Sequence, residues 1–203
     1  MTRTRGLLLA VVAVLTLSGC SGYKVVKSDF VAPASASGAA PLPLIAGLKV
    51  SGQTLTGGFS DMGPAFASRL TNAGLFKIVY YPVRSDDKFD VSIEANFSGS
   101  FVADSATFAK AFLTGFLLLL PSPFVEYEHH YKATGAVSVT QGGQQLKSYS
   151  AESDIVVAVE LAAPATEVQG KGVAAATNDL MDRLITQLNN DRAFFAGLRV
   201  GSQ

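Results

Sequence analysis

The stretch that decides the fold is residues 89–97, Phe89-Asp90-Val91-Ser92-Ile93-Glu94-Ala95-Asn96-Phe97. Apolar side chains stand at every second position, and the residues between them are polar. Successive side chains of a β-strand point to opposite faces, so this alternation is typical of a strand with one buried face. The pattern predicts a strand over residues 89–102. One face, buried in a core, carries Phe89, Val91, Ile93, Ala95 and Phe97, and the other, exposed to solvent, carries Asp90, Ser92, Glu94 and Asn96.

Downstream, two strands and a helix are predicted. Residues 124–140 and 144–161 are predicted to form a pair of strands, because the loop Gln141-Gly142-Gly143 supplies the positive φ angles that a tight hairpin needs. Residues 166–189 read as a helix, with apolar residues at three- and four-residue steps on one face and charged residues outside it. The apolar face is Val173, Ala176, Leu180, Leu184 and Leu188, and the outward residues are Asp179, Asp182 and Arg183.

Upstream, residues 44–50 read as a first strand and residues 61–73 as a helix with Ser60 or Asp61 as its N-cap. Gly74 is expected to end that helix. Residues 75–83, rich in β-branched and aromatic side chains, read as a further strand before a polar turn at 84–88. This order predicts an α+β fold, a mostly antiparallel sheet with helices packed on one face, in a single domain over residues 44–203.

The N-terminus has the pattern of an export signal. Arg3 and Arg5 precede an apolar run over residues 6–15, and small residues lead into Cys20. The run is too short to span a bilayer, which takes about 20 apolar residues.

The four residues Leu17, Ser18, Gly19 and Cys20 resemble the lipobox of bacterial lipoproteins. The resemblance implies that residues 1–19 are a cleaved signal peptide and that Cys20 carries the lipid. Cys20 is the only cysteine, so no intramolecular disulfide can form. Ser21, in place of Asp, implies sorting to the outer membrane, with the protein lipid-anchored on its periplasmic face. Residues 20–43, rich in Ser, Ala, Gly and Pro, predict a flexible tether in which Tyr23–Val26 could form a short strand.

Composition restricts the partners. Without Arg3 and Arg5 the 16 basic residues fall to 14 against 16 acidic ones, a net charge of about −2. No basic patch stands out, so nucleic acid is not an expected partner. The membrane, through the lipid, and an envelope protein are expected.

Residues 66–79 carry a second resemblance, to small α/β domains of envelope accessory proteins. The phrases are Phe66-Ala67-Ser68-Arg69-Leu70 and Ala73-Gly74-Leu75-Phe76-Lys77-Ile78-Val79. They are similar to the N-terminal domain of the Tol-system propeller protein and to penicillin-binding-protein activator lipoproteins. The likeness spans about 35 residues, and it implies fold and compartment rather than activity.

An internal apolar segment covers residues 108–120 and ends at Pro121. It is either a helix buried against the sheet or an apolar surface for a membrane or partner. The candidate interaction residues are Phe112, Phe116, Leu117, Leu118, Leu119 and Leu120.

Chemistry-bearing residues are sparse. On a strand, Glu126, Glu128 and His130 would share a face, as a metal site requires, although a solvated polar face is the simpler interpretation, and we expect no metal and no cofactor. Tyr127, His129 and Tyr131 would share the opposite face. We find no catalytic constellation. The sequence predicts a non-enzymatic envelope lipoprotein that binds another envelope component. The alternative is a module that binds a small apolar or lipid ligand.

Overall fold

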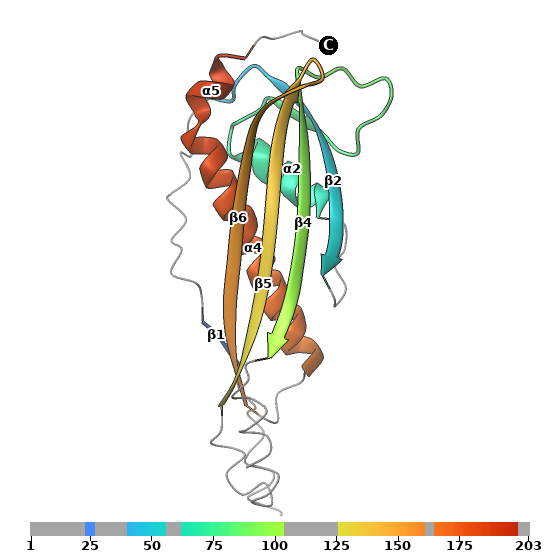
Figure 1. Ribbon diagram of the computed structural model, residues 1–203. Helices are drawn as coiled ribbons and strands as arrows, with labels where there is room; N and C mark the ends of the chain where they lie inside the picture. The colour runs from blue at the N-terminus through green and yellow to red at the C-terminus, as the bar shows by residue number, and fades with distance from the viewer. Residues whose placement is uncertain (1–22, 27–39, 56–61, 104–125, 161–164, 199–203) are drawn as a thin grey trace, which may run out of the picture.

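The computed structural model describes residues 23–26, 40–55, 62–103, 126–160 and 165–198. In chain order the described elements are two strands, a helix, two further strands, a long strand hairpin and two C-terminal helices; Figure 1 shows their arrangement. They are β1 (Tyr23–Val26), β2 (Ile45–Leu55), α2 (Gly63–Asn72), β3 (Ile78–Tyr80), β4 (Val91–Ala103), β5 (Glu126–Gln141), β6 (Gln144–Glu160), α4 (Ala165–Asn190) and α5 (Arg192–Ala196).

The described strands form one six-stranded sheet in the order β1-β6-β5-β4-β2-β3. The pairs β1–β6, β6–β5 and β5–β4 are antiparallel, whereas β2 pairs in parallel with both β4 and β3. In Figure 1 the strands lie in front and the helices cross behind them. The predicted α+β architecture, with helices on one face, is confirmed. The side turned away from the helices is called the open face below.

Strand β4 confirms most of the predicted alternation. Val91, Ile93, Ala95 and Phe97 are all buried against the helices, and Glu94 and Asn96 are exposed on the open face.

The prediction was wrong at the start of this strand. Phe89 precedes the first paired residue, Val91, and its ring lies over Gly47 on the open face, at 2.9 Å from the position a Cβ there would take. Asp90 is 5% exposed, since its carboxylate accepts the Ile45 backbone N–H at 2.8 Å while its own N–H donates to the Ile45 carbonyl at 2.8 Å. Ser92, 7% exposed, pairs with Gly47 and is also buried.

The C-terminal half follows the prediction closely. Gly142 and Gly143 adopt φ angles of 60° and 79°, which close the β5–β6 hairpin. In α4 the residues Ala176, Leu180, Leu184 and Leu188 are buried. The three charged residues predicted to face outward are only partly exposed, because Arg183 donates to Asp179 and Asp182 pairs with Arg69 of α2.

The N-terminal half departs from the prediction at element ends. The N-cap of α2 is Met62, without a side-chain cap, rather than Ser60 or Asp61, while Gly74, at φ 67°, does end the helical segment. The predicted strand over residues 75–83 was too long, since only Ile78–Tyr80 pairs. Leu75 and Phe76 are consecutive and both fully buried, which the two-faced geometry of a strand does not permit. Tyr23–Val26, inside the predicted tether, pairs with β6 as an edge strand.

Helix α4 lies close to the sheet because both surfaces in contact carry a glycine, one on β5 and one on α4 itself. A Cβ on Gly135 of β5 would lie 3.1 Å from Leu184, and one on Gly172 of α4 would lie 2.3 Å from the ring of Tyr131. Gly170, in the same helix, has open space around it.

These two helix glycines provide a matched pair of substitutions. We expect Gly172→Ala to destabilise the protein by about 1–3 kcal/mol, because the buried Tyr131 ring must move to admit the methyl group. Gly170→Ala adds the same methyl group without contact and should stabilise by about 0.5–1 kcal/mol through helix propensity. Urea unfolding of both variants measures the difference. Equal effects in the two would contradict the close approach.

Near its tip, the β5–β6 hairpin packs against α5 through a buried tyrosine. Tyr149 stacks on Phe195 with ring centroids 6.5 Å apart, and the nearby Lys147 ammonium lies 2.6 Å from the Asp191 carboxylate. Among the residues that the structure describes, no partner lies at hydrogen-bond geometry from the buried Tyr149 hydroxyl. Burial, followed by the neighbouring Asp191 carboxylate, raises the pKa of Tyr149 above its ordinary value.

This raised pKa predicts a loss of stability at alkaline pH. The unfolded chain can ionise Tyr149 near its ordinary pKa, whereas the folded chain keeps it neutral, so the contribution is present below about pH 10 and declines above it. Tyr149→Phe should be at least as stable as the wild type at pH 7, since it removes an unpaired buried hydroxyl. The variant should lose less stability between pH 9 and about pH 11 than the wild type in urea titrations. An identical decline in both proteins would exclude this tyrosine as the cause.

Candidate functional site

The residues with the strongest functional signal in the sequence lie outside the described part of the chain. These are the residues that resemble a lipobox, Leu17, Ser18, Gly19 and Cys20. The apolar segment 108–120, with its candidate interaction residues, lies outside it as well.

The residues considered for a metal site lie on β5. His130 is not directed to a carboxylate of its own strand, since its Nδ1 lies 3.2 Å from Oδ1 of Asp154 on β6. His129 is partly buried on the other face, and this burial lowers its pKa. Among the described residues, no group of three or more His, Cys, Asp or Glu side chains is arranged to hold a metal ion.

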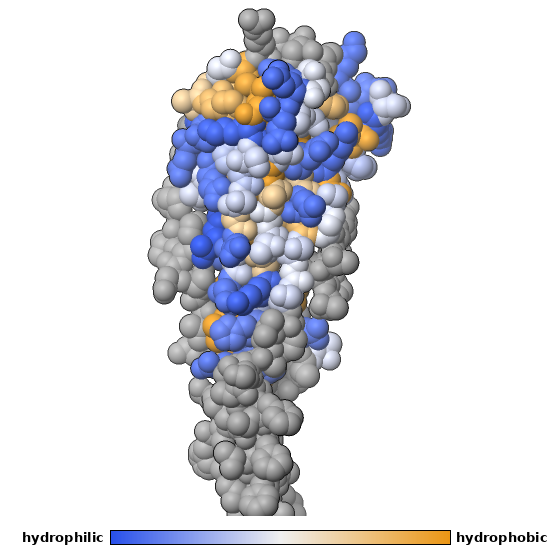
Figure 2. Space-filling model, viewed as in Figure 1, coloured by the Kyte–Doolittle hydropathy of each residue, from blue (hydrophilic) through white to orange (hydrophobic). Residues whose placement is uncertain are grey.

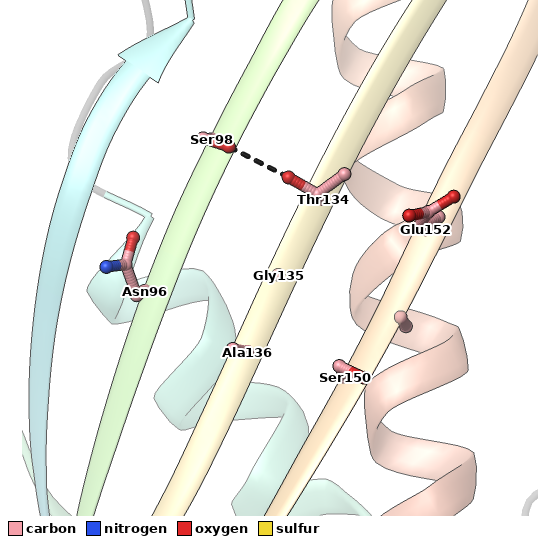
Figure 3. Close-up of a pocket in the computed structure, with 8 residues that line it drawn as sticks. Asn96, Ser98, Thr134, Gly135, Ala136, Ser150 and Glu152 are labelled. Atoms are coloured by element: carbon pink, nitrogen blue, oxygen red, sulfur yellow. Dashed lines mark hydrogen bonds between the residues drawn. The ribbon is translucent and has the colours of Figure 1, made fainter.

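A shallow depression on the open face is the best-defined candidate site. It has a volume of about 510 Å³ and crosses the three central strands β4, β5 and β6 (Figure 3). Its lining is Asn96, Ser98, Thr134, Gly135, Ala136, Ser150, Ala151 and Glu152.

Strand register brings these residues together from distant parts of the sequence. Ser98 pairs with Thr134 and Thr134 with Glu152, which places these three side chains in one row across the sheet. Asn96, Ala136 and Ser150 form the next row in the same way. Gly135 and Ala151 lie between the rows and face the helices, so their backbone forms the floor of the depression.

The side chains in the two rows are short, which is why the surface is hollow there. Only Asn96 and Glu152 extend beyond the size of threonine. Asn96 leans over β2, because a Cβ on Gly52 would lie 2.0 Å from its Oδ1. Gly52 also has a φ angle of 74°, so both space and backbone conformation require glycine at this irregular position of β2.

Most of the polar groups in the depression have unused hydrogen-bonding capacity. The Ser98 and Thr134 hydroxyls share one hydrogen bond of 2.8 Å. The side chains of Asn96, Ser150 and Glu152 form no hydrogen bond or ion pair with the described residues. Donors and acceptors are therefore available to a ligand over the whole width of the three strands.

The other charged residues beside the depression are already paired. Lys49 of β2 lies 3.9 Å from Glu94, and Lys132 lies 3.5 Å from Asp154, which also contacts His130. Glu152 is exposed and stands apart from these pairs. Figure 2 shows the resulting surface, with pale, nearly neutral residues over the middle of the open face between hydrophilic ones.

The arrangement is suited to recognition. The Ser98 hydroxyl bonds to another hydroxyl, and no imidazole is among the lining residues that could take its proton. This site was not predicted from the sequence, although small polar residues do stand at alternate positions of the three strands. Without the register, those positions cannot be assigned to a common surface.

In the described residues, no helix combines the length and apolar character required to cross a membrane.

No family model and no curated protein matches the chain. The solved structures that are similar to this chain in outline include the following two. One is a minor lipoprotein from Acinetobacter baumannii, 11% identical, covering 76% of this chain and 93% of its own, with a TM-score of 0.46. The other, provisionally assigned as a lipoprotein, is from Caulobacter crescentus CB15, 9% identical, covering 74% and 91%, with a TM-score of 0.30. Both likenesses are too distant to establish a family or a function.

Proposed function

We propose that this protein is a non-enzymatic lipoprotein of the bacterial envelope. Its lipidated Cys20 anchors it to the periplasmic face of the outer membrane, and the open face of its sheet binds another envelope protein. The observation that supports binding at the open face is the depression across β4, β5 and β6, in which Asn96, Ser150 and Glu152 have no side-chain hydrogen bond or ion pair with the described residues.

The sequence supports the proposal that a lipid on Cys20 anchors the protein to the membrane. The segment Leu17-Ser18-Gly19-Cys20 follows a basic and then an apolar stretch, in the order of a lipoprotein signal. The mass of the mature protein should equal that of residues 20–203 plus a diacylglycerol and a further acyl group. A mature protein that begins at another residue, or whose Cys20 thiol is unmodified, would contradict the proposed lipid anchor.

The lining of the depression favours a protein partner over a small apolar ligand. Hydroxyl, amide and carboxylate groups line an open surface, whereas sites for small apolar molecules are enclosed and mostly apolar. Strand-borne hydroxyls and amides suit the peptide groups and polar side chains at the rim of a protein interface.

Site-specific photo-crosslinking in intact cells tests binding at the open face. A photoreactive phenylalanine at Ser98 or Ser150, in the depression, should join the protein to one discrete envelope protein. The controls are Ala174 and Asn190, which are exposed on α4 in the other layer. The same product from all four positions, or no product from Ser98 and Ser150, would contradict a partner at the open face.

A further inference from the structure

Glu152 is a charged residue of the open face that forms no ion pair with the described part of the chain. Its carboxylate has no ion pair with the described residues, while Lys49 and Lys132 on the same face are directed to Glu94 and Asp154. A carboxylate on a protein surface is well solvated and gains little from a distant charge. It gains more from a cation that arrives with a partner and displaces water around it.

The space beside Glu152 can accept a long side chain. Its neighbours across the sheet and along β6 are Thr134 and Ser150, both short, and Ala136 adds only a methyl group. The volume of about 510 Å³ exceeds that of a single side chain and lies within the usual range of about 300–1,000 Å³ for binding pockets. In Figure 3 the Glu152 carboxylate stands at one border of this space, opposite Asn96 across the three strands.

The other polar groups of the depression can form hydrogen bonds with the backbone of a partner segment that carries such a side chain. The Asn96 amide can both donate to and accept from a peptide group, and the Ser150 hydroxyl can do the same. Asn96 lies on β4, whereas Ser150 and Glu152 lie two residues apart on β6, so a partner segment crossing the strands could contact all three.

From this arrangement we infer that the partner inserts a lysine or arginine side chain into the depression and pairs it with Glu152. The inference rests on the proposed binding function of the open face and specifies the chemistry of the partner at that surface. Asn96, Ser98, Thr134 and Ser150 then contact the polypeptide on both sides of the inserted cation.

Charge variants of Glu152 combined with crosslinking at Ser98 test the inference in the full-length, membrane-anchored protein. Glu152→Lys should reduce the crosslinked product at least about tenfold, because like charges would face each other across a contact. Glu152→Asp should retain most of the product. The control Glu167→Lys makes the same change of net charge on the exposed start of α4 and should leave the yield unchanged.

Mass spectrometry of the crosslinked product then identifies the partner segment. It should contain a lysine or arginine, and changing that residue to glutamate should restore crosslinking to Glu152→Lys. An undiminished yield in Glu152→Lys, an equal loss in Glu167→Lys, or a segment without a basic residue would overturn the inference, while binding by the open face would stand. No product from the wild-type background would overturn the proposed binding function itself.

Discussion

Phe97→Ala is expected to destabilise the protein by about 3–5 kcal/mol, the largest effect of any single core change considered for this fold. Phe97 is fully buried at the middle of β4. Its ring meets Phe66 of α2 edge to face at a centroid distance of 5.4 Å, and it lies 3.1 Å from the position a Cβ on Gly135 would take. The substitution leaves a cavity where the ring was. Because β5 and α2 both pack against this ring, neither can fill the cavity without moving the other.

The matched control is the next residue of the same strand. Ser98 is exposed on the open face, so Ser98→Ala should change the free energy of unfolding by less than about 1 kcal/mol. Both variants can be compared by urea unfolding followed by circular dichroism. A loss of under about 1 kcal/mol in Phe97→Ala would mean that this ring does not support the packing between sheet and helices.

Cys20→Ala is expected to release the protein from the membrane almost completely. The thiol is the proposed site of lipid attachment, and each buried methylene contributes about 0.8 kcal/mol to membrane binding. Two or more acyl chains therefore make release very slow, and their absence leaves only weak contacts. Fractionation of cell envelopes should recover the wild type in the outer-membrane fraction, whereas the variant should carry no lipid and should be recovered in the soluble fraction.

The matched control for this prediction is Ser21→Ala, which changes the next residue and keeps the thiol. It should carry the same lipid mass as the wild type. Metabolic labelling with a fatty acid separates the two variants directly. Label on the Cys20→Ala protein would contradict the anchor at this position.

The features that the sequence by itself determined are local ones. The alternation from Val91 to Phe97, the glycine pair Gly142-Gly143 and the apolar stripe along α4 each depend on residues close together in the chain. Period and turn chemistry act over this short range, so the strand, the hairpin and the helix could be predicted before any contact was known. The resemblance of residues 17–20 to a lipobox likewise depends on neighbouring residues alone.

The tertiary structure decided what depends on partners distant in sequence. Asp90 looks like a solvent-facing residue of an alternating strand, yet it is buried because Ile45 offers it both a donor and an acceptor. Leu75 and Phe76 looked like strand residues, yet both are buried in a connection. The depression exists only because register sets Ser98, Thr134 and Glu152 in one row, and a shift of one residue would turn those side chains to the other face. Within the described ranges Glu152 has no ion pair for the same reason, since strand pairing sets which lysines lie within reach of which carboxylates.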